Sequence, residues 1–211
     1  MILIIIMHNE MNIDVAVRRR FPVPELVQIE GAQFISICGK GDPSGKQFAD
    51  RIEALYSTAY AIKFSFKSKG QDFVVSKLEG LWWFDEKKFT NQTIISASVE
   101  VPRSEWEYRL LIRLPEFVTK QDLEKAKETV IINKDVQLAR HIEFFTMTEG
   151  KSIQMLHVGP FSTEPETLKQ IQTLIVTNKL TKNGLHHEIY LSDFRKTEPD
   201  KLKTILREPV E

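Results

Sequence analysis

The spacing of apolar residues along the chain predicts an amphipathic helix shortly after residue 44. Ser44 and Gln47 have the spacing of a capping box, which marks a helix N-terminus. Apolar residues then recur every three or four positions, which places them on one side of a helix. This stripe, which we expect to be buried, consists of Phe48, Ile52, Leu55, Ala59 and Ile62.

Two further helices are predicted by the same signals. Thr163 and Glu166 form a second capping-box pattern, and the helix that follows ends near Asn178. Its apolar stripe consists of Leu168, Ile171 and Ile175. A third helix begins with the capping pattern at Thr119 and runs to about Thr129.

Segments rich in β-branched and aromatic residues predict strands between the helices. They cover residues 73–78, 81–84, 93–101 and 107–113. Within the last but one of these, local alternation of apolar and small polar residues in 94–99 favours a strand with one solvated face. The first half of the chain is therefore expected to carry an inserted hairpin.

An internal repeat organises the chain. Residues 33–44 superimpose on residues 151–162 as a strand, a glycine-containing turn and a serine near a helix start. Residues 110–115 similarly echo residues 204–209. Each half then has the order strand, helix, strand, strand. The repeat predicts an α+β fold of duplicated βαββ modules, with pseudo-two-fold symmetry and a ligand cleft between the halves.

The repeat also suggests domain boundaries. Residues 1–30 form an N-terminal extension and residues 31–211 one domain, with halves at about 31–118 and 140–211 joined by a helix. The apolar start, residues 1–7, would span roughly 10 Å as a helix, against about 30 Å for a bilayer core. It is too short to cross a membrane, so we expect no membrane partner.

Composition narrows the class of partner and the compartment. Lys and Arg number 29, as do Asp and Glu, so no net field attracts nucleic acid or an anionic membrane. The single Cys38 cannot form an internal disulfide, which indicates a reducing compartment, the cytoplasm. Because Cys38 lies in an apolar strand, we expect an inert thiol in the core.

The candidate chemistry lies in residues 185–193, a strand-like segment that carries ionisable groups among apolar ones. With a period of two, His186, Glu188 and Tyr190 share one face, and His187 lies on the other. A buried carboxylate without a partner is costly. Glu188 therefore needs a partner, a raised pKa or a cavity in front of it.

Aromatic residues supply candidate ligand contacts. Trp82 and Trp83 are adjacent, so on a strand they face opposite sides and only one can lie wholly in the core. The other either grips a flat aromatic or cationic ligand or is covered by loops. Tyr56 and Tyr60, four apart on the shoulder of the first helix, either reach a pocket edge or pack with bonded hydroxyls.

Common catalytic templates do not fit. Gly39-Lys40-Gly41 lacks the spacing of a phosphate-binding loop, and no serine lies in a nucleophile-elbow pattern. His186 and His187 point apart on a strand, and no further His or Cys pair completes a zinc site. We therefore expect neither a metal nor a cofactor.

Six short segments together resemble the gyrase-inhibitor-like (GyrI-like) small-molecule-binding family, most closely its stand-alone branch without a DNA-binding domain. The segments are 39–43 (GKGDP), 53–56 (EALY), 79–83 (EGLWW), 112–115 (IRLP), 186–193 (HHEIYLSD) and 203–210 (KTILREPV). Two features depart from the family pattern, the N-terminal extension and Glu208 before Pro209, and we place both away from the pocket.

The resemblance implies a function. In drug-responsive regulators of this family a strand glutamate receives cationic aromatic ligands, and Glu188 occupies the matching position. The stand-alone branch resembles hydrolases that open the cyclopropane of cyclopropanoid genotoxic compounds, a detoxification. In that interpretation Glu188 and Tyr190 are catalytic. The expected ligand-binding residues are Trp82, Trp83, Tyr56, Tyr60 and His186.

Two classes of function stay open from the sequence. The first is this hydrolase, in which Glu188 accepts a proton from the attacking water. The second is a non-catalytic binder that sequesters hydrophobic or cationic aromatic drugs, or a gyrase inhibitor. In both, the partner is a small hydrophobic aromatic molecule.

Overall fold

The computed structural model describes residues 5–7, 23–90 and 93–211, and the chain divides into two compact units. The first unit comprises residues 1–31, 82–102 and 148–211, and the second comprises 32–81 and 103–147. Both units combine helices with mainly antiparallel strands. The fold is therefore α+β, as the sequence predicts.

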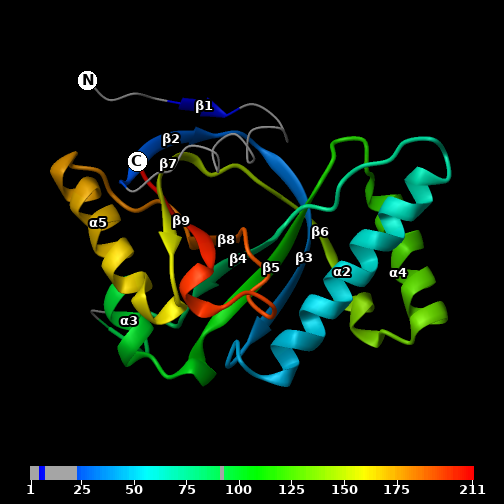
Figure 1. Ribbon diagram of the computed structural model, residues 1–211, viewed down its shortest axis with the longest axis horizontal. Coiled ribbons are helices and arrows are strands. Elements are labelled where there is room, and N and C mark those ends of the chain that lie inside the picture. Colours follow the sequence, from blue (N-terminus) through cyan, green and yellow to red (C-terminus); the bar gives the residue numbers. More distant parts are fainter. Residues whose placement is uncertain (1–4, 8–22, 91–92) are drawn as a thin grey trace. The chain divides into compact units, whose positions relative to one another are not determined.

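Among its described residues, the first unit has five strands whose order does not follow the chain (Figure 1). In spatial order they are β1 (Ile5–Met7), β2 (Glu25–Ile29), β7 (Gly150–Val158), β9 (Lys203–Pro209) and β8 (His186–Tyr190). All neighbours pair antiparallel except β1 and β2, which are parallel. The helices among the described residues of this unit are α3 (Ile94–Glu100) and α5 (Glu164–Thr177), with 3₁₀ turns η3 (Phe161–Thr163) and η4 (Pro199–Lys201).

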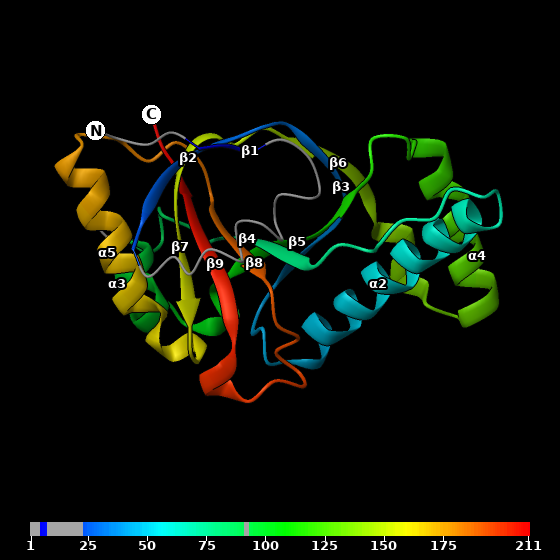
Figure 2. The same cartoon turned by 45° about the horizontal axis from the view of Figure 1, so that its top comes forward.

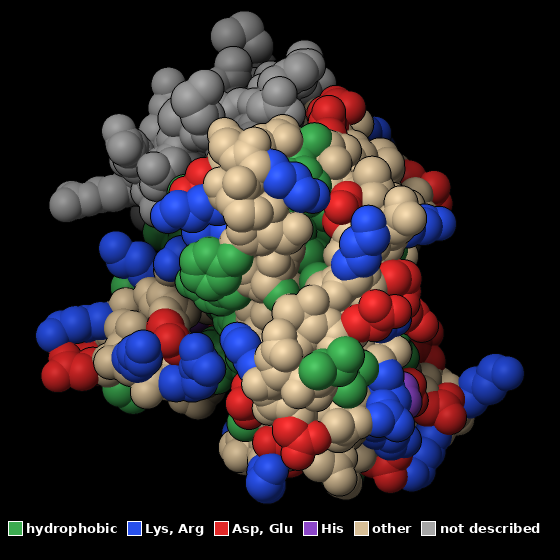
Figure 3. Space-filling view, turned by 90° about the vertical axis from the view of Figure 1, so that its right-hand side faces the viewer, with side chains coloured by type: hydrophobic (Ala, Val, Ile, Leu, Met, Phe, Trp, Pro, Cys, Tyr) green, Lys and Arg blue, Asp and Glu red, His purple; other side chains and the backbone are tan. Residues whose placement is uncertain are grey.

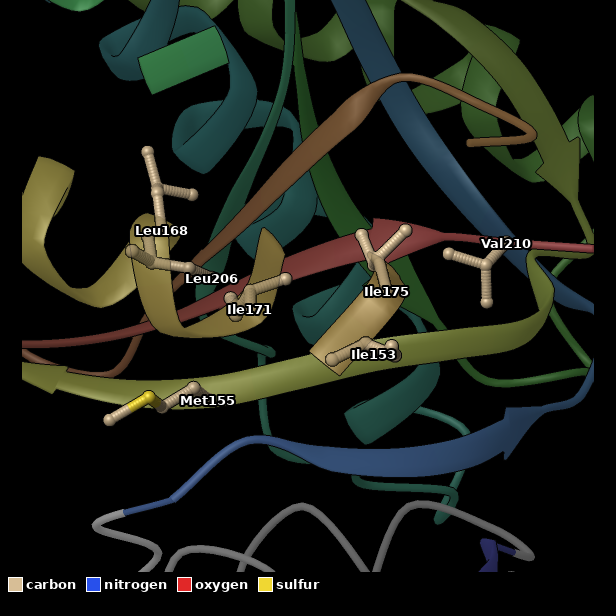
Figure 4. Packing of buried hydrophobic residues seen from close by; sticks show 7 residues of the cluster. All are labelled: Ile153, Met155, Leu168, Ile171, Ile175, Leu206 and Val210. Atoms are coloured by element: carbon tan, nitrogen blue, oxygen red, sulfur yellow. The ribbon is translucent and has the colours of Figure 1, made fainter. Parts of the chain in front are cut away.

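Helix α5 packs its apolar stripe on β7 and β9, and it also contacts α3. Figure 4 shows the resulting core, in which helix and strand side chains interdigitate. The cluster consists of Ile153, Met155, Leu168, Ile171, Ile175, Leu206 and Val210. The three predicted stripe residues of α5 all belong to it, because the period that places them on one side of the helix also directs that side to the sheet.

The second unit contains three neighbouring antiparallel strands, in the order β5 (Glu107–Leu114), β3 (Ala32–Lys40) and β6 (Glu143–Met147). Its helices α2 (Lys46–Lys67) and α4 (Lys120–Lys134) lie side by side (Figure 2). Two 3₁₀ turns complete it, η1 (Arg103–Glu105) and η2 (Gln137–His141). The predicted stripe of α2 is buried at all five positions. Strand β4 (Leu78–Trp83) begins in this unit and ends with two residues of the first.

The predicted order of elements is present in both halves. The first half runs β3, α2, β4, β5, with α3 inserted before β5, and the second runs β7, α5, β8, β9. The turns that follow β3 and β7 also match. Gly41 and Gly159, aligned by the repeat, have φ of 115° and 138°, a region that residues with a Cβ rarely enter.

Two strand predictions are wrong. Residues 93–101 form helix α3 rather than a strand, and residues 73–77 have no regular structure, so there is no inserted hairpin in the described part of this region. The β-branched residues misled the prediction, because intrinsic strand preference is weak beside local capping. The Thr93 side chain accepts from the Ser96 N–H, and the Ser96 hydroxyl accepts from the Thr93 N–H, a capping box that starts the helix.

The three predicted caps differ in outcome. Thr119 caps α4 with the predicted capping box to Asp122, and the helix continues beyond Thr129 to Lys134. Ser44 is not the cap of α2, which begins after Gly45, because its hydroxyl donates to Asp42 in the preceding turn. The Thr163 hydroxyl donates to the Pro160 carbonyl and makes no cap bond to α5.

The surface of the described residues agrees with the balanced composition. On the face shown in Figure 3, acidic and basic side chains are interspersed. Cys38, expected in the core, is exposed, because it lies on the outward-facing side of β3 near its end. No helix in the described ranges has the length and apolar character required to span a bilayer.

Candidate functional site

Strand β8 places its ionisable side chains on two faces, as the period of two predicts. Glu188 and Tyr190 pair in register with Leu206 and Thr204 of β9, and Leu206 belongs to the core under α5. His186, Glu188 and Tyr190 therefore lie on the α5 side of the sheet. His187 pairs with Arg207 and lies on the opposite side.

His186 lies between two carboxylates. Its Nδ1 is 2.6 Å from Glu208 Oε1, and its Nε2 is 3.3 Å from Glu188 Oε1. The side chains of His186 and Glu208 are almost completely buried, and that of Glu188 is 13% exposed. A carboxylate accepts and does not donate, so both ring nitrogens must carry a proton. The contacts thus define an imidazolium between two carboxylates.

The electrostatics of the site agree with these contacts. Burial alone would lower the pKa of His186, but the charge of Glu208 and the hydrogen bonds to Glu188 and Glu208 raise it to about 10. Burial alone would raise the pKa of Glu208, yet His186 and then Lys182 hold it below its usual value. Lys182 Nζ lies 3.2 Å from the second oxygen of Glu208. Both ions are present at neutral pH.

Tyr190 connects Glu188 to Trp82. The Trp82 indole N–H donates to the Tyr190 hydroxyl over 3.0 Å, and Tyr190 hydrogen bonds Glu188. Burial raises the pKa of Tyr190 well above its usual value, and the charge of Glu188 raises it further. Tyr190 is therefore a neutral phenol that donates to Glu188. Glu188 accepts from an imidazolium and from a phenol.

Two phenylalanines complete the surroundings of the phenol. The rings of Phe161 and Phe194 meet the Tyr190 ring in T-shaped contacts, with centroids 6.1 and 5.6 Å apart. They also contact each other at 5.9 Å. Phe161 is 39% exposed, so this aromatic group extends from the buried phenol to the surface. Edge-to-face aromatic groups of this kind present faces to which a flat ligand can bind.

Glu164, the first residue of α5, adds a third carboxyl to the group. It is buried, and its Oε1 has no hydrogen-bond partner. Burial raises its pKa well above the usual value, the negative charge of Glu188 raises it further, and His186 opposes the shift. Burial and the neighbouring charge of Glu188 thus favour the protonated form of Glu164. The charges of Glu188 and Glu208 are then balanced by His186 and Lys182.

The opposite side of the same strands holds a separate ion-pair network. Glu149 Oε1 lies 2.8 Å from His187 Nδ1, and Glu149 Oε2 lies 2.5 Å from Arg207 Nη1. Burial alone would raise the pKa of Glu149, but the charges of Arg207 and His187 lower it to about 2. Arg207 also donates twice to Gln154 of β7. Both carboxylate oxygens of Glu149 thus bond protein groups, and so does the Arg207 guanidinium, which indicates a structural role.

The structure brings together part of the predicted set. Glu188, Tyr190, His186 and Trp82 form one connected group, and Trp83, next to Trp82 on β4, is partly buried.

Tyr56 and Tyr60 belong to α2 of the second unit. Tyr56 is partly buried and Tyr60 is 42% exposed. Their rings lie 6.5 Å apart, and the Tyr60 ring stacks on Phe64 at 6.0 Å. Their role as ligand contacts stays a prediction.

The placement of Glu208 away from the site was wrong. The register of β8 on β9 pairs Glu188 with Leu206 and His187 with Arg207, so one step further His186 meets Glu208. A prediction that included the pairing of β8 with β9 would have found this contact. In an antiparallel pair, each step forward along one strand is matched by a step backward along the other, so one known pair fixes all the others. Glu164 and Phe161 were also missed, because helix-start patterns indicate capping and carry no sign of a neighbouring strand.

Ligands for a metal are not assembled here. Within the described ranges, no group of three or more His, Cys, Asp or Glu side chains has an arrangement that could hold a metal ion. The carboxylates of the site are occupied by His186, Lys182 and Tyr190 instead.

The fold and the strand site together define a small-molecule-binding domain. The GyrI-like small molecule binding domain matches residues 22–211, and the chain belongs to this family. Among solved structures, a hydrolase from Listeria innocua is 34% identical, with a TM-score of 0.79, and the match covers 95% of this chain and 98% of that one. An uncharacterized conserved protein from the same organism has the same identity and coverage and a TM-score of 0.82.

More distant structures share the fold alone. The C-terminal domain of EcmrR is 11% identical, with a TM-score of 0.55, over 89% of this chain and 96% of that domain. The comparison with curated proteins gave no match.

Proposed function

We propose that this chain is a hydrolase that opens the cyclopropane ring of cyclopropanoid aromatic compounds and so detoxifies them. The observation that carries the proposal is Glu188, a carboxylate on a buried strand that accepts from Tyr190 and His186 within an aromatic surround. The 34% identity to a structure described as a hydrolase supports the reaction class. The exposed, single Cys38 fits a reducing compartment such as the cytoplasm.

The proposed step requires one water and no cofactor. Glu188 takes a proton from the water, and the water oxygen forms a bond to a cyclopropane carbon conjugated to a dienone. The carbon–carbon bond of the ring breaks, and its electron pair moves through the ring to the carbonyl oxygen, which becomes a phenolate. The phenolate then takes up one proton, and Glu188 releases the proton that it took from the water, which returns it to the carboxylate form. The product equals the substrate plus one water.

The aromatic residues would hold the flat substrate. Phe161 and Phe194 flank Tyr190, and Trp82 donates to its hydroxyl, so the phenol is fixed from three sides. Fixed groups favour catalysis because little reorganisation is needed as charge develops. Trp83 and the α2 tyrosines Tyr56 and Tyr60 are proposed as further ligand contacts.

Replacement of Glu188 by glutamine tests the proposal. Glutamine is nearly isosteric, so we expect binding of a neutral aromatic ligand to persist while turnover falls about 10² to 10⁴-fold, the usual contribution of a positioned base. The assay incubates the protein with a cyclopropanoid alkylator and measures the gain of one water by mass spectrometry. Full hydrolytic activity in folded Glu188→Gln would remove Glu188 from the mechanism.

A non-catalytic binder of cationic aromatic drugs is the alternative. The family description, small molecule binding, and the carboxylate form of Glu188 favour it, since a buried carboxylate attracts a cation. In that case the wild-type protein would bind the alkylator without adding water. Glu188→Gln would then weaken the binding of cationic ligands and leave the affinity for neutral ligands unchanged. Measuring turnover and both affinities on the same two proteins separates the functions.

A further inference from the structure

Glu208 is linked to Glu188 through the imidazole of His186. Its Oε1 lies 2.6 Å from His186 Nδ1, and the opposite ring nitrogen lies 3.3 Å from Glu188. Glu208 and His186 are 3% and 2% exposed. Since an imidazole ring is rigid, a carboxylate that fixes one nitrogen also fixes the direction of the other.

The groups that face His186 come from three elements and one loop. Glu188 and Tyr190 lie on β8, Glu208 on β9 and Glu164 at the start of α5, while Lys182 precedes β8 and pairs with Glu208. Glu188 and Glu208 hydrogen bond the ring directly. Of these two, Glu208 is 22 residues away in sequence and lies on the side of the ring remote from Glu188.

We propose that Glu208 is a positioning residue for Glu188, acting through His186, and that this role rests on the hydrolysis proposed above. Glu208 keeps His186 in its doubly protonated form. The imidazolium then donates to Glu188 and holds its carboxylate in one orientation, so that Glu188 can accept the proton of the attacking water. The partly exposed Lys182 ammonium pairs with the second oxygen of Glu208 and offsets its negative charge, which allows this carboxylate to remain buried.

The chain offers a matched control on the adjacent residue. Glu149 contacts His187 Nδ1 at 2.8 Å, just as Glu208 contacts His186 Nδ1 at 2.6 Å. The two histidines lie on opposite faces of the same strand. Glu149→Gln therefore removes a similar buried carboxylate, but from His187 and not from His186. Any effect that Glu208→Gln shares with Glu149→Gln is structural, and an effect seen in Glu208→Gln alone belongs to His186.

The first measurement follows the imidazole nitrogens by NMR as a function of pH. In the wild type, His186 should carry both protons at pH 8, since the pKa of His186 is raised to about 10. In Glu208→Gln, His186 should lose one of these protons at a lower pH than in the wild type. In Glu149→Gln, His186 should titrate as in the wild type. A neutral His186 in the wild type at pH 8 overturns the proposal. Because this result needs no variant, the proposal can be tested even if Glu208→Gln does not fold. Equal titration of His186 in the wild type and Glu208→Gln also overturns it.

The second measurement is the pH dependence of hydrolysis. The wild-type rate should stay level from pH 7 to 9, whereas kcat of Glu208→Gln should fall about tenfold for each pH unit above the lowered pKa of His186, with KM little changed. Below that pKa the variant should approach wild-type turnover. A profile of Glu208→Gln that superimposes on the wild type overturns the positioning role. A wild type that adds no water refutes the hydrolase itself, and the NMR titration still judges the Glu208–His186 pair.

Discussion

At the scale of single residues, the adjacent histidines of β8 show how one strand serves two purposes. His186 pairs with Glu208 on the α5 side, and His187 pairs with Glu149 on the other, each through Nδ1. On the Glu149 side the carboxylate bonds both His187 and Arg207. On the Glu208 side the contacts lead through Glu188 to a phenol, and the carboxyl oxygen of Glu164 has no partner. The two faces of the strand therefore differ in the groups that their histidines join.

Tyr190→Phe tests the phenol at this scale. The ring contacts with Phe161 and Phe194 would remain, but the Trp82 N–H would lose its buried acceptor and Glu188 one donor. An unsatisfied buried polar group costs about 1 to 3 kcal/mol, so we expect the free energy of unfolding to fall by that amount. Urea denaturation measures it.

Tyr60→Phe is the matched control for this variant. Tyr60 is 42% exposed on α2, so loss of its hydroxyl should change the free energy of unfolding by less than about 0.5 kcal/mol. Equal stability of Tyr190→Phe and the wild type would show that the phenol makes no effective hydrogen bond.

The sequence predicted the faces of β8 but not the partners on them. Alternation alone placed His186, Glu188 and Tyr190 together, because it depends only on the two-residue period. The partners Glu208 and Glu149 are 22 and 38 residues from their histidines. Contacts at that separation depend on strand pairing, which single-residue preferences do not encode.

At the scale of elements, capping decided between helix and strand where propensity did not. The segment Ile94–Glu100 contains β-branched residues that favour a strand, yet the Thr93–Ser96 capping box starts a helix there. Where pattern and capping agreed, as in α4, the predicted start was correct. The serine before α2 has the same spacing, but it binds Asp42 and leaves the helix to start after Gly45.

Thr119→Ala tests the functioning cap of α4. The variant loses the acceptor for the Asp122 N–H and the donor to the Asp122 carboxylate. Loss of such a cap costs about 1 kcal/mol, so thermal and urea unfolding should show a decrease of that size.

Ser44→Ala provides the comparison for the cap variant. Its hydroxyl bonds Asp42 in an exposed turn and caps no helix, so we expect a change within about 0.5 kcal/mol. A larger cost for Ser44→Ala than for Thr119→Ala would contradict this assignment of the caps.

At the scale of the whole molecule, the internal repeat was the most informative feature of the sequence. It predicted the order strand, helix, strand, strand in both halves, because a duplicated chain keeps the order of its elements even when individual side chains diverge. It could not predict α3, which lies in the first half only. Nor could it predict the charge balance of the site, since Glu164, Glu188 and Glu208 come from three different elements of one half.

The pH dependence of stability follows from these carboxyls, which act in opposite directions. Glu149, with its pKa lowered to about 2, stabilises the fold above the unfolded value near 4.5, and this stability is lost as the pH falls toward 2. Glu164 has a raised pKa, so between its unfolded and folded values the folded state holds a proton that the unfolded state has released. Stability therefore decreases as the pH rises through that window, by up to about 1.4 kcal/mol per pH unit from this group.

Glu164→Gln should remove that decrease. Glutamine resembles the protonated carboxyl in shape and charge, so the variant should keep the packing of α5 and unfold at a higher urea concentration than the wild type at neutral pH. The difference should grow from pH 5 upward by up to about 1.4 kcal/mol per unit and then level off above the folded pKa of Glu164. Glu166→Gln, an exposed change in the same helical turn, should show no such trend. If Glu164→Gln is instead less stable than the wild type by an amount independent of pH, Glu164 is ionised in the folded state, and the balance of charge around His186 must include it.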